Sequence, residues 1–129
     1  KRFTTLREGA LNQQVVEVQL RRLDTLFDEL LQGVPGDGDP PRVFLKMDTQ
    51  GFDLEVFRGL GERVQQVVGL QSEVALLSIY DEMPRMHEVL EAYEAAGFEI
   101  SGFYPVTSEP DGRVIEYDCV LVRASACLS

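Results

Sequence analysis

Hydrophobic residues along the chain follow two different spacings. Short runs rich in apolar and β-branched residues predict strands, and apolar positions three and four residues apart predict amphipathic helices. The predicted strands cover residues 15–20, 43–47, 67–77, 98–106 and 114–123. Predicted helices follow each of the first three strands, over residues 21–31, from Asp53 onward, and from Pro84 to the glycine stop at Gly97.

The order of these elements predicts an α/β fold. Strands that alternate with helices favour a doubly wound, mostly parallel sheet with helices on its faces. Residues 43–47 and 67–74 should therefore be neighbouring parallel strands. No helix separates the last two strands, and a Pro-Asp-Gly turn at residues 110–112 joins them. We expect these two strands to close the sheet as an antiparallel hairpin.

A glycine-rich stretch at residues 33–38 has the composition of a nucleotide-binding loop but the wrong surroundings. Such a loop needs a strand before the glycines and a helix N-terminus after them. Here a predicted helix precedes the glycines, and the sequence Asp-Pro-Pro follows them. We interpret residues 33–42 as a linker.

Composition narrows the functional classes. The 129 residues fit a single domain, residues 1–129, and the net charge of −10 disfavours binding to nucleic acid. No apolar stretch approaches the roughly 20 residues of a membrane helix, so no membrane association is expected. Cys119 and Cys127 form no metal-binding or disulfide pattern, which favours a reducing, cytoplasmic setting.

Candidate chemistry gathers where the strand at residues 43–47 ends. Asp48 follows this strand directly, and open α/β sheets bind ligands at the carboxyl ends of their strands. An aspartate here can instead cap the backbone of the loop. Lys46 lies on the same side of the strand as Asp48 and can form a structural ion pair, with Glu73 on the next strand as the candidate partner. Asp53 can accept backbone N–H groups at the start of the next helix.

The same segment resembles the FkbM methyltransferase family. The family pattern K-[I/M]-D-x-[E/Q]-G-x-[E/D] matches residues 46–53, and a family glycine matches Gly59. Further similar stretches cover residues 22–26, 69–73, 79–84, 90–98, 102–105, 111–112 and 118–120. The resemblance extends from about residue 15 onward.

The resemblance implies a Rossmann-like methyltransferase that transfers a methyl group from S-adenosylmethionine to a hydroxyl oxygen of a small molecule or sugar. It implies a catalytic role for Asp48 and donor contacts from Asp48 and Thr49. No metal site is indicated, although Asp48 with Glu73 could hold a hard cation if other oxygen ligands joined them. The proposed acceptor-binding residues are Lys46, Gln50, Glu73 and Tyr80. The glycine loop and the ribose-binding acidic residue of the family are expected upstream. We therefore expect the chain to be the C-terminal part of the domain, without the cofactor-binding N-terminal half, and inactive alone.

One alternative class stays open. Residues 81–86, Asp-Glu-Met-Pro-Arg-Met, are similar to the phosphoacceptor region of receiver domains, although the spacing is one residue short. A non-catalytic α/β interaction module or a receiver-like signalling module is therefore the alternative. His87, the only histidine, is expected on an exposed helix face, although histidine is a frequent general base. The acceptor and the oligomeric state are left open.

Overall fold

The structure of this chain is a computed structural model that describes residues 16–35, 38–76 and 83–126. Its main elements are α1 (Leu23–Leu31), β1 (Val43–Lys46), α2 (Asp53–Arg58), β2 (Val67–Ala75), α3 (Met86–Ala95), β3 (Phe98–Ser108) and β4 (Val114–Arg123). Two 3₁₀ turns, η1 (Gly61–Gln66) and η2 (Ala124–Ala126), complete them. Six of the eight predicted elements match the observed ones closely, and the helix from Asp53 is split into α2 and η1.

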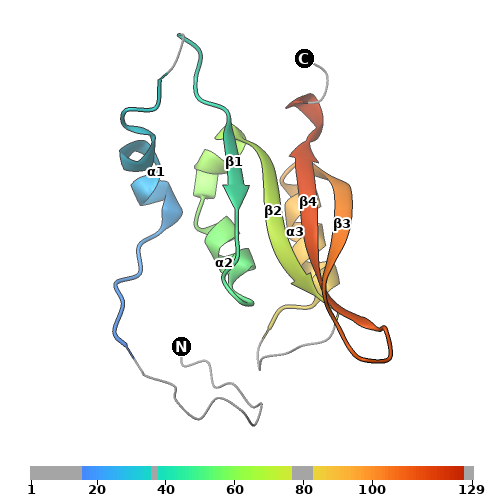
Figure 1. Cartoon of the computed structure of the whole chain (residues 1–129). Coiled ribbons are helices and arrows are strands. Elements are labelled where there is room, and N and C mark those ends of the chain that lie inside the picture. Colours follow the sequence, from blue (N-terminus) through green and yellow to red (C-terminus); the bar gives the residue numbers. More distant parts are fainter. Residues whose placement is uncertain (1–15, 36–37, 77–82, 127–129) are drawn as a thin grey trace.

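The four strands form one mixed sheet in the order β1-β2-β4-β3 (Figure 1). The expected parallel pairing of β1 with β2 and the expected hairpin of β3 with β4 are both confirmed. The expectation of a mostly parallel sheet is not met, since two of the three pairings are antiparallel. The cause is that β4 returns from the hairpin and inserts between β2 and β3. Strands β1, β2 and β3 still run in the same direction.

The helices of the described residues share one hydrophobic core on one face of the sheet. Phe57 of α2 meets Tyr93 of α3 edge-on, with ring centroids 4.7 Å apart. Phe27 of α1 belongs to the same cluster, together with Leu70 of β2. On the other face Phe44 stays half exposed. A doubly wound arrangement, with helices on both faces, is therefore not found in the part of the chain that the structure describes.

The predicted strand at residues 15–20 is wrong for the described residues 16–20. They carry no regular secondary structure, and the side chains of Val16, Val18 and Leu20 are 66%, 72% and 80% exposed. An extended segment becomes a strand only when another strand satisfies its backbone groups. No described strand pairs with this segment. The sequence of one segment does not show whether a partner strand is present.

Arg123 at the end of β4 holds several elements together. Its guanidinium group donates hydrogen bonds to the carbonyl oxygens of Val67 (2.9 Å), Ala96 (3.0 Å) and Val64 (2.6 Å). The same group lies 4.4 Å from the ring centroid of Phe98. One side chain thus links β4 to η1, to β2 and to the C-terminus of α3.

We expect Arg123→Ala to lower the free energy of unfolding by about 2–3 kcal/mol, because three partly buried carbonyl groups lose a charged donor. Arg123→Lys should lose less, since its ammonium can reach only some of these oxygens. Urea denaturation measures both values. Arg113→Ala, which removes an exposed arginine from the β3–β4 turn, is the control. Equal losses for the alanine variants of Arg123 and Arg113 would show that the linking role is absent.

Candidate active site

The turn after β1 has an unusual backbone. Gln50 and Gly51 both adopt positive φ angles, of 52° and 91°. Glycine takes this conformation freely, but a side chain such as that of glutamine is strained there by roughly 1–2 kcal/mol. A Cβ atom on Gly51 would also lie 3.0 Å from the Cγ of Met83. Backbone strain of this kind clusters at functional sites, which singles out this turn.

Asp53 fixes the turn to the neighbouring strand. One carboxylate oxygen accepts hydrogen bonds from the backbone N–H (2.9 Å) and the hydroxyl of Thr49. The other accepts from the Ser72 hydroxyl (2.9 Å) and from the backbone N–H of Glu73 (3.0 Å). The expected capping of its own helix is therefore wrong. Asp53 is the first residue of α2 and is buried, and its partners lie upstream and on β2.

Asp48 and Lys46 lie at the carboxyl end of β1, as predicted. The Lys46 ammonium is 3.6 Å from an Asp48 carboxylate oxygen, and both side chains are about 60% exposed. The suggested ion pair between Lys46 and Glu73 is not found. The register of β1 and β2 places Lys46 opposite Gln71 and not opposite Glu73. The Lys46 ammonium pairs instead with Asp48, two residues further along the chain. An exposed pair of this kind contributes little to stability, so Asp48 remains accessible to a ligand.

Glu73 lies near the carboxyl end of β2 and accepts a hydrogen bond from the side-chain amide of Gln50 at 3.3 Å. Burial raises the pKa of Glu73 to about 7, and the negative charges of Glu116, Asp48 and Asp118 add to the shift. Asp118 is its direct neighbour across the β2–β4 ladder. A carboxyl group that titrates near neutral pH can accept a proton from a reacting group at physiological pH.

The raised pKa also predicts a pH-dependent effect on stability. Because the folded-state pKa of about 7 lies above the ordinary 4.5, ionisation of Glu73 destabilises the fold as the pH rises from about 5 to 7. We expect Glu73→Gln to be nearly neutral at about pH 5 and stabilising at about pH 8. Thermal denaturation at both values measures it. The control is Glu99→Gln at an exposed site on β3, and a gain that does not depend on pH would contradict the prediction.

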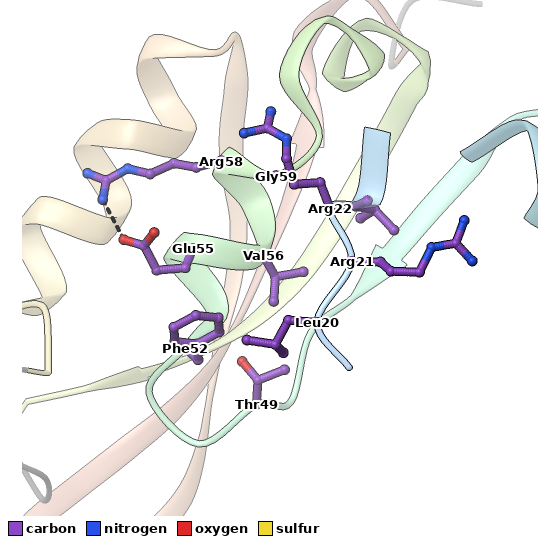
Figure 2. A pocket seen from close by; sticks show the side chains of 10 residues that line it. Leu20, Arg21, Arg22, Thr49, Phe52, Glu55, Val56, Arg58 and Gly59 are labelled. Atoms are coloured by element: carbon purple, nitrogen blue, oxygen red, sulfur yellow. Dashed lines mark hydrogen bonds and ion pairs between the residues drawn. The ribbon is translucent and has the colours of Figure 1, made fainter. Parts of the chain in front are cut away.

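A pocket opens beside the same turn, on the side toward α1. It has a volume of about 450 Å³, within the range of roughly 300–1,000 Å³ that small-molecule sites occupy. Figure 2 shows Thr49 and Phe52 from the turn after β1, Val56 from α2 and Leu20 from the segment before α1. The turn thus separates two environments, the carboxylates beside β2 and this largely apolar pocket.

Comparison with known proteins identifies the family. Residues 3–100 match the family model of the methyltransferase FkbM domain. The chain belongs to the FkbM methyltransferase family. No curated protein and no solved structure matches it. The match covers about three quarters of the chain, including the turn after β1 and the first half of the sheet.

Within this FkbM methyltransferase chain, the structure gathers most of the predicted site residues. Asp48, Gln50 and Glu73 meet at the carboxyl ends of β1 and β2, and Lys46 pairs with Asp48. Thr49 lies on the turn, but its hydroxyl is bonded to Asp53. Tyr80 lies outside the described residues, as does Asp81 of the receiver-like motif. His87 is exposed on α3, as expected.

The sequence did not predict the residues that hold the turn after β1 in place or those that surround Glu73. The central role of Asp53, and its link through Ser72 to the hydroxyl of Tyr93 (2.8 Å), come from the fold. So do the negative charges of Glu116 and Asp118 around Glu73. One signal was available, since acidic residues recur with a spacing of two in β4, which a half-exposed strand favours.

The described residues show neither a metal-binding group nor a membrane-spanning helix. No group of three or more potential protein ligands is arranged to hold a metal ion in the part of the chain that the structure describes. None of the helices described is long and apolar enough to cross a membrane.

Proposed function

We propose that the protein is an S-adenosylmethionine-dependent methyltransferase that methylates a hydroxyl oxygen of a small molecule or sugar. The observation that carries this proposal is the placement of Asp48 and Glu73 at the carboxyl ends of two parallel strands, close enough for the Asp48 charge to help raise the Glu73 pKa to about 7. Family membership supports the transferase over the receiver-like alternative.

The charge around Glu73 fits the proposed methyl donor. The negative charges of four carboxylates, those of Glu116, Asp48, Asp118 and Asp53, add to the effect of burial in raising the pKa of Glu73. A positively charged sulfonium centre beside them would relieve this repulsion. The described residues contain no glycine loop between a strand and a helix for the adenosyl group. We propose that this loop belongs to an upstream half, together with the remaining strands of a doubly wound sheet.

When bound, S-adenosylmethionine supplies an electrophilic methyl group and leaves as a neutral thioether. The chain's own residues would do the rest. Asp48, exposed at the end of β1, orients the acceptor hydroxyl by accepting a hydrogen bond from the hydroxyl proton. Glu73 takes the proton, because its pKa lies close to physiological pH. Gln50 holds the Glu73 carboxylate in place, and Thr49 lies beside the donor.

Positioning is the larger part of the expected acceleration. Methyl transfer needs the acceptor oxygen in line with the methyl carbon, and such alignment alone can supply roughly 7–11 kcal/mol of the barrier. The Asp53 network holds the turn after β1 against β2 and so fixes the distance between the two carboxylates.

The buried free thiol of Cys119 is compatible with the proposed cytoplasmic location.

The test of this proposal is a mass-spectrometric screen. The purified full-length protein, which includes the proposed upstream half, is incubated with isotope-labelled S-adenosylmethionine and a panel of hydroxylated metabolites and sugars. We expect labelled products whose mass corresponds to one added methyl group per hydroxyl acceptor. Label on nitrogen or carbon acceptors alone would replace the proposed reaction, and the absence of label from every class of acceptor would contradict it.

A further inference from the structure

The pocket beside the turn after β1 has an apolar floor and a basic rim. Leu20, Phe52 and Val56 provide the floor, and Arg21, Arg22 and Arg58 lie around it (Figure 2). Glu55 is the only acidic residue among the side chains that line it. The chain as a whole has 22 acidic and 12 basic residues, so three arginines at one pocket depart from its average composition.

Each of these arginines is held by a carboxylate of its own. Arg22 pairs with Asp24 at 2.7 Å, Arg58 with Glu55 at 2.9 Å and Arg21 with Glu29 at 3.2 Å. The guanidinium groups lie apart around the rim and do not meet at its centre (Figure 2).

These ion pairs are open to competition from a ligand. The three arginine side chains are between 46% and 64% exposed. Ion pairs in water contribute little, because hydration competes with them and holding two long side chains costs entropy. A ligand oxyanion can form two parallel charge-assisted hydrogen bonds with one guanidinium. These bonds are stronger than an exposed ion pair, because a ligand that fills the pocket shields them from water.

We propose that this pocket selects a methyl acceptor that is an amphiphilic anion. Its apolar ring or chain lies on Leu20, Phe52 and Val56, and its carboxylate or phosphate group is held by the arginines at the rim. The inference rests on the proposed function for the role of acceptor, and deepens it by naming the substrate class. A cationic ligand has no acceptor group for these arginines, and a neutral sugar lacks the charge that makes their hydrogen bonds strong.

The position of the pocket supports this role. Thr49 lines it, and the next residue, Gln50, holds the Glu73 carboxylate on the other side of the turn. The pocket and the Glu73 carboxylate thus lie on two sides of one turn, and an acceptor anchored by its anion at the rim would reach past this turn to the carboxylates. The acidic side favours the positively charged donor and the basic side favours the anionic acceptor, so the two ligands are sorted by charge.

Binding is tested without turnover, using phenyl phosphate and its neutral counterpart benzyl alcohol as probes. Nuclear magnetic resonance follows the side-chain Nε–H signals of the arginines. Phenyl phosphate should shift the signals of Arg22 and Arg58 and leave that of Arg113 unchanged. The Arg21→Gln, Arg58→Gln double variant should bind phenyl phosphate about tenfold more weakly, and Arg113→Gln should bind it normally. Equal shifts at Arg113, or equal binding by the double variant, would overturn the proposal.

The oxyanion could also belong to the donor, whose methionine part carries a carboxylate. Calorimetric titration of the same variants, made in the full-length protein that includes the proposed upstream half, with S-adenosylmethionine separates the two sources. We expect the donor affinity of the double variant to stay within about twofold of the original. If the donor affinity falls tenfold and phenyl phosphate does not bind, the acceptor assignment is wrong.

Turnover gives the second readout, and it separates this inference from the proposed function. For a hydroxylated aryl phosphate and its neutral analogue, the double variant should raise KM about tenfold for the phosphate only, with kcat unchanged. Equal KM values for the two acceptors in the unmodified protein would overturn the inference. A protein that transfers no methyl group contradicts the proposed function, and the binding of phenyl phosphate then still decides whether the rim recognises anions.

Discussion

Replacement of Asp53 by alanine is expected to lower the free energy of unfolding by about 3–5 kcal/mol. The buried carboxylate accepts hydrogen bonds from Thr49, Ser72 and Glu73. Alanine leaves these donors without their acceptor in a region where water has little access, and each buried unsatisfied group costs about 1–3 kcal/mol. Urea denaturation monitored by circular dichroism measures the loss.

Two further variants make this prediction specific. Asp53→Asn should lose part of the same stability, because its amide points one donor group toward other donors. Asp111→Ala removes an aspartate that also accepts from a backbone N–H and an arginine, but at an exposed turn. That control should change stability by less than about 1 kcal/mol. If Asp53→Ala and Asp111→Ala cost the same, the Asp53 network does not hold the turn after β1.

Replacement of Asp48 by asparagine is expected to lower kcat for methyl transfer by roughly 10²–10⁴-fold, the contribution of a positioned acid or base. Asparagine keeps the shape of the side chain and removes its charge. The Asp48 carboxylate is exposed and pairs only weakly with Lys46, so the free energy of unfolding should change by less than about 1 kcal/mol. Affinity for S-adenosylmethionine should change little.

Steady-state kinetics and urea denaturation of the same preparation measure the two quantities side by side. Asp111→Asn, which alters an exposed aspartate in the β3–β4 turn, is the matched control and should leave kcat unchanged. If Asp48 only caps the loop after β1, the Asp48→Asn variant will show a fall in the free energy of unfolding at least as large as the loss that its lower kcat represents. An Asp48→Asn protein with unchanged kcat would remove Asp48 from the mechanism.

Much of the local structure was predictable from the sequence because its signals are local. The spacing of Val89 and Tyr93 predicted the buried face of α3, and both are buried. The Pro-Asp-Gly turn predicted the hairpin of β3 and β4, and Asp111 does accept the backbone N–H of Arg113 there. The short apolar run before Asp48 predicted β1 and its parallel partner.

The remaining features depend on contacts between distant residues. The insertion of β4 between β2 and β3 has no signature in any one segment, and it made the sheet less parallel than expected. Residues 16–20 alternate as a strand does, but no described strand pairs with them. Asp53 has the position of a helix cap, and only the packing of α2 against β2 directs its carboxylate to Ser72 instead.

The same distinction applies to the candidate site. Asp48 and Gln50 were predicted from one stretch of sequence, since both follow β1. The raised pKa of Glu73 could not be predicted from one stretch of sequence, because it depends on burial and on charges from β4. The arginine rim was likewise invisible, since Arg21 and Arg58 lie far apart in the sequence and only the packing of the segment before α1 beside α2 brings them to one pocket.

The most direct test of the central claim follows the methyl group itself. The purified full-length protein, which includes the proposed upstream half, is combined with S-adenosylmethionine carrying ¹³C in its methyl group and with an acceptor that has one hydroxyl and one carboxylate or phosphate. The product is examined by nuclear magnetic resonance. We predict a labelled methyl group bonded to the hydroxyl oxygen, formed by the unmodified protein and not by the Asp48→Asn, Glu73→Gln double variant. Label on another atom, or equal product from the double variant, would contradict the assignment of methyl transfer to these two carboxylates.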